Sequence, residues 1–249
     1  MPAHIPGNEF PEHTSAAMHL EHKDEEKHVG VIGNERLTAL VSLVLLVLII
    51  VELVTSAFLR IWLPAHTVVG VLLVGPLLVK MGSTGWRFLR YYTRTPAYVR
   101  RGPPPLVLRV LGPMLLVTTL VMVGSGIGLV VTGPTQPFLL AHVFSALPWL
   151  PLMAVHSLAH LQQVKRRLAD DWSTQQGPRS QIGRGLRLGV NLGVLLLGVI
   201  GAWLLFPAAI PLFAWSQANV IGVGPFLVGM GAALLVGLIT QPWKMEKVG

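Results

Sequence analysis

The chain contains no cysteine among its 249 residues, and only 12% of its residues are charged. The absence of cysteine excludes disulfides, iron–sulfur clusters, thiolate ligands and covalently attached c-type haem. The scarcity of charge, together with a mean hydropathy of +0.62 and repeated apolar runs, predicts a polytopic membrane protein. The formal net charge of +8 does not indicate a nucleic-acid partner, because the basic residues fall between the apolar runs and not on one soluble face.

Six apolar runs are long enough to cross a bilayer, and they predict an all-α membrane protein with six transmembrane helices. The expected spans are about residues 37–59, 65–82, 106–131, 138–161, 187–206 and 222–240. They make residues 37–240 one transmembrane domain, followed by a cytoplasmic tail at 241–249. Residues 1–36 are polar and rich in histidine without the spacing of a tight metal site, so we expect a disordered or frayed cytoplasmic extension. A weak metal-binding tail is the alternative.

The distribution of Lys and Arg predicts the orientation of the spans. These residues concentrate in segments 83–105 and 162–187, whereas segments 60–64, 132–137 and 207–221 hold almost none. The positive-inside rule then places both termini in the cytoplasm. We expect a multi-pass protein of the bacterial cytoplasmic membrane.

The span at 138–161 carries three histidines, His142, His156 and His160. An ionisable side chain inside a membrane is costly and by default marks a functional site. His142 and His156 are 14 residues apart, which is about 21 Å along a helix and about 40° in azimuth. One helix would therefore hold two metal ligands on one face, one near each side of the membrane, as two stacked haems require.

The span at 65–82 repeats this spacing with His66 and Lys80. Both spans run from outside to inside, so His66 and His142 share the outer end while Lys80 and His156 share the inner end. Two imidazoles at matched depth on neighbouring parallel helices can clamp one b-type haem through its iron. We therefore expect a haem-binding four-helix bundle with His66 and His142 as the ligands of an outer haem.

At the inner end the set of candidate ligands for a second haem is incomplete. His156 is the candidate metal ligand there, and Lys80 is an axial ligand, a propionate partner or a lysine that snorkels to the interface. His160, one turn further on, is a propionate partner, an interface residue or the true inner ligand. Arg87 is a candidate for a haem propionate, or one of the basic residues that anchor the inner side. The expected cofactor is haem b, in one or two copies. The alternative for all the histidines is helix–helix hydrogen bonding.

Glu52 is the only acidic residue expected inside the first span. It would hydrogen-bond a ligand histidine on a neighbouring helix or take a proton from a quinol, and the alternative is a protonated or Ser/Thr-paired carboxyl near the interface. At the outer end of the third span, Gly124, Gly126 and Gly128 remove side-chain bulk, which suits a haem edge or tight helix packing.

The H-x13-H pattern of span 138–161 resembles that of membrane di-haem cytochromes b, as in quinol–cytochrome c reductases and ferric-reductase-like transmembrane families. In those families two parallel helices each give two histidines, which implies that His66, His142 and His156 are haem ligands here; the sequence departs from the pattern at Lys80. The stretches HTVVGVLLVGPLLVKMGSTGWRFLRYYT and RGPPPLVLRVLGP are also similar to a group of actinobacterial six-span membrane proteins, a likeness that implies no activity.

The function expected from these features is that of a b-type cytochrome subunit. It would carry electrons between a quinol or cytoplasmic donor and a partner redox protein. We expect an electron-transfer subunit of an oxidoreductase and not a complete enzyme, because no flavin- or nicotinamide-binding segment follows the last span. Its expected partners are the lipid bilayer, other redox subunits and quinone. The alternatives are a histidine-lined cation, proton or metal transporter and an accessory subunit of a larger membrane complex.

Overall fold

The computed structural model of the chain describes residues 12–99, 106–172, 183–219 and 222–244, and all regular secondary structure in these ranges is helical. The helices are α1 (Glu12–Ala57), α2 (Leu59–Tyr92), α3 (Pro96–Val99), α4 (Leu106–Thr132), α5 (Gln136–Trp172), α7 (Arg184–Leu205), the 3-10 helix η1 (Pro207–Ala209), α8 (Ile210–Ala218) and α9 (Gly224–Thr240). Six of them, α1, α2, α4, α5, α7 and α9, are long and apolar enough to cross a membrane. The predicted all-α architecture with six membrane-spanning helices is therefore confirmed.

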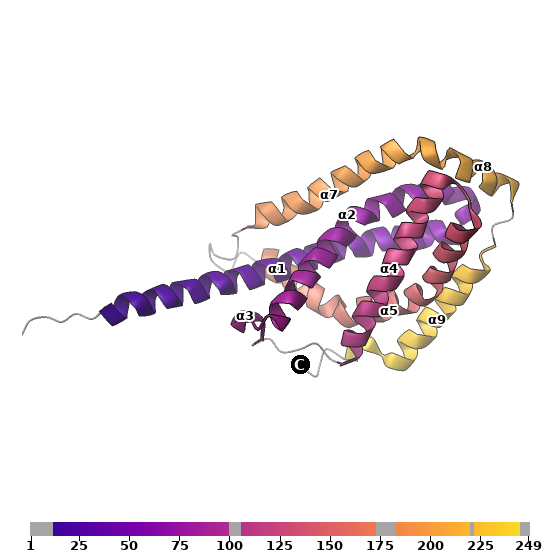
Figure 1. Cartoon of the computed structure of the whole chain (residues 1–249). Coiled ribbons are helices and arrows are strands. Elements are labelled where there is room, and N and C mark those ends of the chain that lie inside the picture. Colours follow the sequence, from indigo (N-terminus) through magenta and orange to yellow (C-terminus); the bar gives the residue numbers. More distant parts are fainter. Residues whose placement is uncertain (1–11, 100–105, 173–182, 220–221, 245–249) are drawn as a thin grey trace, which may run out of the picture.

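Four of these helices form a ring. Helix α1 packs against α2 and α5, and α4 packs against the same two helices, so that α2 and α5 lie diagonally across the ring. In the described part of the chain the backbones of α2 and α5 barely approach each other. Helix α7 packs on the outside of α2, and α9 packs on the outside of α5 (Figure 1).

The apolar core fills the middle of this ring. Its buried residues come from five helices: Leu45, Ile49, Leu73, Leu111, Leu115, Trp149, Leu150, Val155 and Ala233. The indole nitrogen of Trp149 on α5 donates a hydrogen bond of 2.9 Å to the hydroxyl of Thr119 on α4. Both side chains are buried, so this bond satisfies a polar group that would otherwise cost free energy inside the bundle.

Helices α2 and α7 pack closely through glycine. A Cβ atom on Gly75 would fall 2.8 Å from the carbonyl oxygen of Val194, and one on Gly198 would fall 3.1 Å from Cα of Leu72. Small residues let membrane helices approach each other closely enough for backbone contact. The α2–α7 interface therefore depends on the absence of side chains at Gly75 and Gly198.

The turn between α1 and α2, the turn between α4 and α5, and helix α8 gather at one end of the bundle, which we call the α8 end (Figure 1). Leu63, Leu129 and Leu212 form a buried cluster there, with Phe213 and Trp215 of α8 in the surrounding layer. Helix α8 thus covers this end of the four-helix ring. The opposite end, near α3, holds the C-terminal ends of α2 and α5.

Two helices extend beyond the expected bounds of their spans. Helix α1 begins at Glu12 and has 46 residues, so it is about 69 Å long, roughly twice the thickness of a bilayer's hydrocarbon core. The expectation of a disordered or frayed extension is therefore wrong for residues 12–36, while residues 1–11 lie outside the described part. The segment contains no proline and many good helix formers, so the transmembrane helix continues through it.

Helix α2 likewise continues to Tyr92, well past the expected end of its span at about residue 82 and into the basic segment 83–105. No proline interrupts the helix between residues 83 and 92, and it ends four residues before Pro96. Arg94, within this connection, has a φ of 56°. The N–H of Arg94 donates to the Tyr91 carbonyl and that of Thr95 to the Arg90 carbonyl, a Schellman motif that ends the helix. The basic segment therefore extends the span as a helix before it turns.

Candidate functional site

The structure brings the imidazole rings of His66 and His142 together. Their centroids are 6.2 Å apart, and their planes are nearly perpendicular at 85°. His66 lies in α2 and His142 in α5, the two helices that face each other diagonally across the ring. Both side chains are largely enclosed by the bundle, close to its α8 end.

Two groups on α1 contact the Nδ1 atom of His66. The Glu52 carboxylate oxygen Oε1 and the Ser56 hydroxyl oxygen both lie 3.2 Å from it. The Ser56 hydroxyl donates its own proton to the backbone carbonyl of Glu52, at 2.7 Å, so toward the ring it can only accept. Nδ1 of His66 therefore carries the proton, and Nε2 carries the lone pair. Of the alternatives that the sequence leaves open for Glu52, the structure shows the contact with a histidine on a neighbouring helix.

A different helix fixes the ring of His142. Its Nδ1 atom lies 2.9 Å from the backbone carbonyl oxygen of Met122 on α4, which can only accept. The Ser125 hydroxyl is 3.4 Å from the same nitrogen, but it donates to the carbonyl of Val121 at 2.6 Å. His142 thus also carries its proton on Nδ1. Among the described residues, neither Nε2 atom has a hydrogen-bond partner.

Glycines make room for both rings. A Cβ atom on Gly126 of α4 would fall 3.1 Å from Cε1 of His142 and 3.3 Å from its Nδ1 atom. On α2, a Cβ atom on Gly70 would fall 3.3 Å from Oε1 of Glu52. The ring of His142 and the carboxylate beside His66 therefore each lie against a position that lacks a side chain.

The other two glycines of the α4 series have different surroundings. A Cβ atom on Gly128 would overlap the ring of Phe138, at 2.7 Å, so this glycine serves packing between α4 and α5. A Cβ atom on Gly124 would meet nothing within 4 Å. Of the three glycines singled out in the sequence, only Gly126 touches the histidine pair.

The separation of the two rings would suit a single metal ion held between them. With each nitrogen about 2.0 Å from a metal, the centroids of two opposed imidazoles lie about 6.3 Å apart. The observed separation of 6.2 Å agrees. The described residues contain no group of three or more His, Cys, Asp or Glu side chains that could hold a metal ion. A haem iron needs only two protein ligands, because the porphyrin supplies four nitrogens.

The inner candidates are arranged differently. His156 and His160 lie on successive turns of α5, with ring centroids 4.9 Å apart and planes at 60°. This separation is too short for two ligands on opposite faces of one iron, and both rings belong to one helix. In the described part of the chain, no second imidazole faces His156 from α2. His160 also contacts the side chain of Gln163, with Nδ1 3.2 Å from Oε1.

Lys80 is held by α1. Its ammonium group donates a hydrogen bond of 2.5 Å to the hydroxyl of Ser42, and it lies within electrostatic range of His156. Ser42 in turn donates to the backbone carbonyl of Thr38. The Thr38 hydroxyl donates to that of Ser83, at 3.0 Å, which returns the connection to α2.

Sequence reasoning missed this polar connection. Its signal is the spacing of Asn34, Thr38 and Ser42, which recur every fourth residue and therefore share one face of α1.

Arg87 lies near the C-terminal end of α2 and is exposed. Its neighbours Trp86 and Phe88 are exposed as well, and the guanidinium group of Arg90 lies 4.3 Å from the ring centroid of Trp86. The structure therefore keeps Arg87 apart from the interior of the bundle, at the end of the molecule opposite α8.

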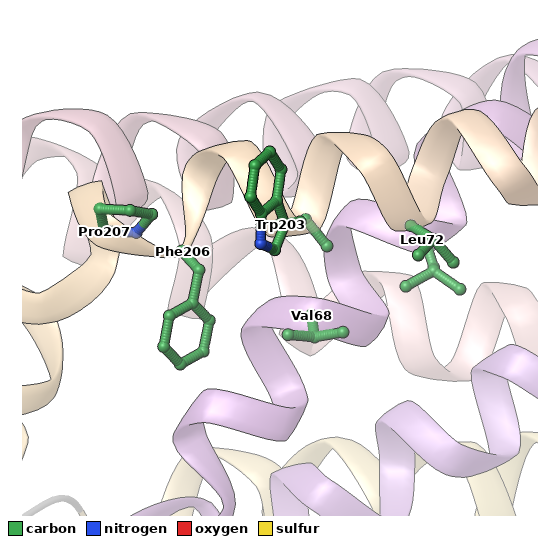
Figure 2. Close-up of a pocket in the computed structure, with 7 residues that line it drawn as sticks. Val68, Leu72, Trp203, Phe206 and Pro207 are labelled. Atoms are coloured by element: carbon green, nitrogen blue, oxygen red, sulfur yellow. The ribbon is translucent and has the colours of Figure 1, made fainter.

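A separate hollow of about 360 Å³ lies between α2 and α7 (Figure 2). Its lining residues are all apolar: Val68, Leu72, Val199, Ala202, Trp203, Phe206 and Pro207. Val68 and Leu72 fall about 200° and 240° around the helix from His66, so the hollow opens on the opposite face of α2. It is distinct from the histidine pair.

Comparisons with models of known protein families, with curated proteins and with solved structures gave no match.

Proposed function

We propose that this protein is a b-type cytochrome subunit of a membrane electron-transfer system, with His66 and His142 as the axial ligands of one haem b. The observation that carries the proposal is the 6.2 Å separation of the two rings. Both rings have their proton on Nδ1, so both Nε2 lone pairs are available to a metal. A bound haem supplies a one-electron iron couple at this position.

The surroundings of the pair suit electron transfer. If His66 and His142 both held the iron, no position would be left open for oxygen, which would favour a carrier of electrons. Glu52 and Ser56 fix one ring from α1, while the backbone of α4 fixes the other. Helix α8 and its Leu212, Phe213 and Trp215 side chains cover the nearer end of the bundle and limit access of water.

The direction of transfer follows from the expected topology. The positive-inside rule puts the α8 end, and with it the proposed haem, toward the outer side of the membrane. The opposite end presents exposed basic side chains, among them Arg87, Arg90 and Arg94. Such a surface suits the docking of an acidic redox partner, while a quinol would approach from the bilayer. Electrons would pass between such a donor and an outer partner protein.

The proposal includes one haem. His156 remains a candidate ligand for a second, with Lys80, His160 and Arg87 as candidate contacts for it. Its support is weaker, because Lys80 is bonded to Ser42 and no imidazole faces His156 in the described chain. The two ends of the bundle therefore differ, and within the part of the chain that the structure describes only the α8 end brings two imidazoles from facing helices together.

The experiment is a pyridine haemochrome assay on protein purified after haem-replete expression. We expect protohaem in the wild type and its loss in His66→Ala and in His142→Ala. His160→Ala is the matched control, because it removes an imidazole from the same helix as His142 without touching the pair. Wild-type protein without protohaem would refute the proposal, and retention of haem in His142→Ala would remove this pair as its site.

A further inference from the structure

We propose that Glu52 is a positioning residue for His66 and that its carboxylate lowers the reduction potential of the haem iron. The inference rests on the proposed function, because it concerns one of the two proposed axial ligands. It assigns a role to a residue on α1, a helix that contributes no ligand itself. It also implies that the two proposed ligands, His66 and His142, differ in basicity.

The Nδ1 atoms of His66 and His142 have different hydrogen-bond partners. His142 donates to a neutral backbone carbonyl, that of Met122, at 2.9 Å. His66 has a carboxylate oxygen of Glu52 at 3.2 Å and the Ser56 hydroxyl at the same distance. A carboxylate partner orients a ligating imidazole and makes it more basic. A more basic ligand, with a negative charge behind it, stabilises ferric over ferrous iron.

The Glu52 carboxyl group contacts the ring of His66 and, on its own helix, the side chain of Thr55. Oε1 lies beside Nδ1 of His66, and Oε2 is buried without a hydrogen-bond partner among the described residues. The side chain is only 19% exposed. Burying a carboxyl group with so few partners is costly in free energy, so a role in packing alone would not account for it.

Gly70 gives this carboxylate its position. It lies one turn after His66 on the same face of α2, and a Cβ atom there would fall 3.3 Å from Oε1 of Glu52. A methyl group at Gly70 would therefore press on the carboxylate and weaken its contact with His66. This provides a second way to disturb the contact without removing either residue.

The test is a potentiometric redox titration of the purified haem protein. Glu52→Gln keeps the shape and a carbonyl acceptor but removes the negative charge. We expect full haem content and a reduction potential raised enough to shift the Fe(III)/Fe(II) ratio about tenfold toward Fe(II), which is about 59 mV for a one-electron couple. Gly70→Ala should shift the potential in the same direction by a smaller amount. Gly82→Ala is the matched control, because a Cβ atom at this position on the same helix meets nothing within 4 Å.

The possible outcomes test the role of Glu52 and the proposed function separately. An unchanged potential in Glu52→Gln with full haem content overturns the role of Glu52 and leaves the proposed function intact. Absence of haem from the wild type overturns the proposed function itself. If Glu52→Gln fails to fold or to retain haem, Gly70→Ala decides: a raised potential supports the inference, and a potential equal to that of Gly82→Ala overturns it.

Discussion

The rings of His66 and His142 lie with their centroids 6.2 Å apart, although they belong to helices whose backbones barely approach each other. Each ring is fixed by a helix other than its own: His66 by Glu52 and Ser56 of α1, and His142 by the Met122 carbonyl of α4. The site thus needs all four helices of the ring. A change on any of them that moves one ring should be detectable as a change in haem binding.

Gly126→Val should reduce haem content severalfold. The new Cβ atom would lie 3.1 Å from Cε1 of His142, and its two methyl groups would push the imidazole away from the axis it shares with His66. The measurement is haem per protein after purification under identical conditions. Gly124→Val is the control, because a Cβ atom at that position of α4 meets nothing within 4 Å. Equal haem content in the two variants would show that Gly126 does not position the ring.

Lys80→Met and His156→Ala should each leave one haem per protein. The hydrogen bond from Lys80 to Ser42 and the contact between His156 and His160 both lie at the end opposite the proposed haem. Haem stoichiometry from the pyridine haemochrome and a protein assay checks this. A fall from two haems to one in either variant would instead establish a second haem at His156.

Gly75→Ala should lower the thermal stability of the protein in detergent. Its Cβ atom would fall 2.8 Å from the Val194 carbonyl oxygen, so α2 and α7 would have to separate, at a cost of about 1–3 kcal/mol. Gly189→Ala on α7 is the control, since a Cβ atom there meets nothing within 4 Å. Because alanine favours helix over glycine by about 1 kcal/mol, the control should be neutral or slightly stabilised. A thermal midpoint for Gly75→Ala equal to that of the control would contradict the close α2–α7 packing.

The spans and the contact of Glu52 with a histidine on the next helix could be predicted from the sequence. Span length follows from hydropathy, and the shared depth of His66 and His142 follows from the alternation of basic and neutral segments. These features depend only on position along each helix. The structure adds the ring contact itself.

The surroundings of Lys80 could not be predicted, because they depend on the rotation of α1 relative to α2. That rotation turns Ser42 toward Lys80, so that the two side chains form a hydrogen bond. The rotation of α4 could not be predicted either. The spacing of its glycines does not reveal that Gly126 faces His142, whereas a Cβ atom on Gly124 would meet nothing within 4 Å. Helix α1 is longer than expected because its polar N-terminal residues, although typical of a disordered tail in composition, favour helix.

The central claim is that His66 and His142 hold one iron between two nearly perpendicular imidazoles. Low-temperature electron paramagnetic resonance of the oxidised protein tests it most directly, since the spin state and anisotropy of ferric haem report its axial ligands and their relative orientation. The rings lie at 85° to each other, so we expect a strongly anisotropic low-spin ferric signal that disappears in His66→Ala and in His142→Ala. A high-spin ferric signal in the wild type, or a low-spin signal that survives both substitutions, would contradict the account.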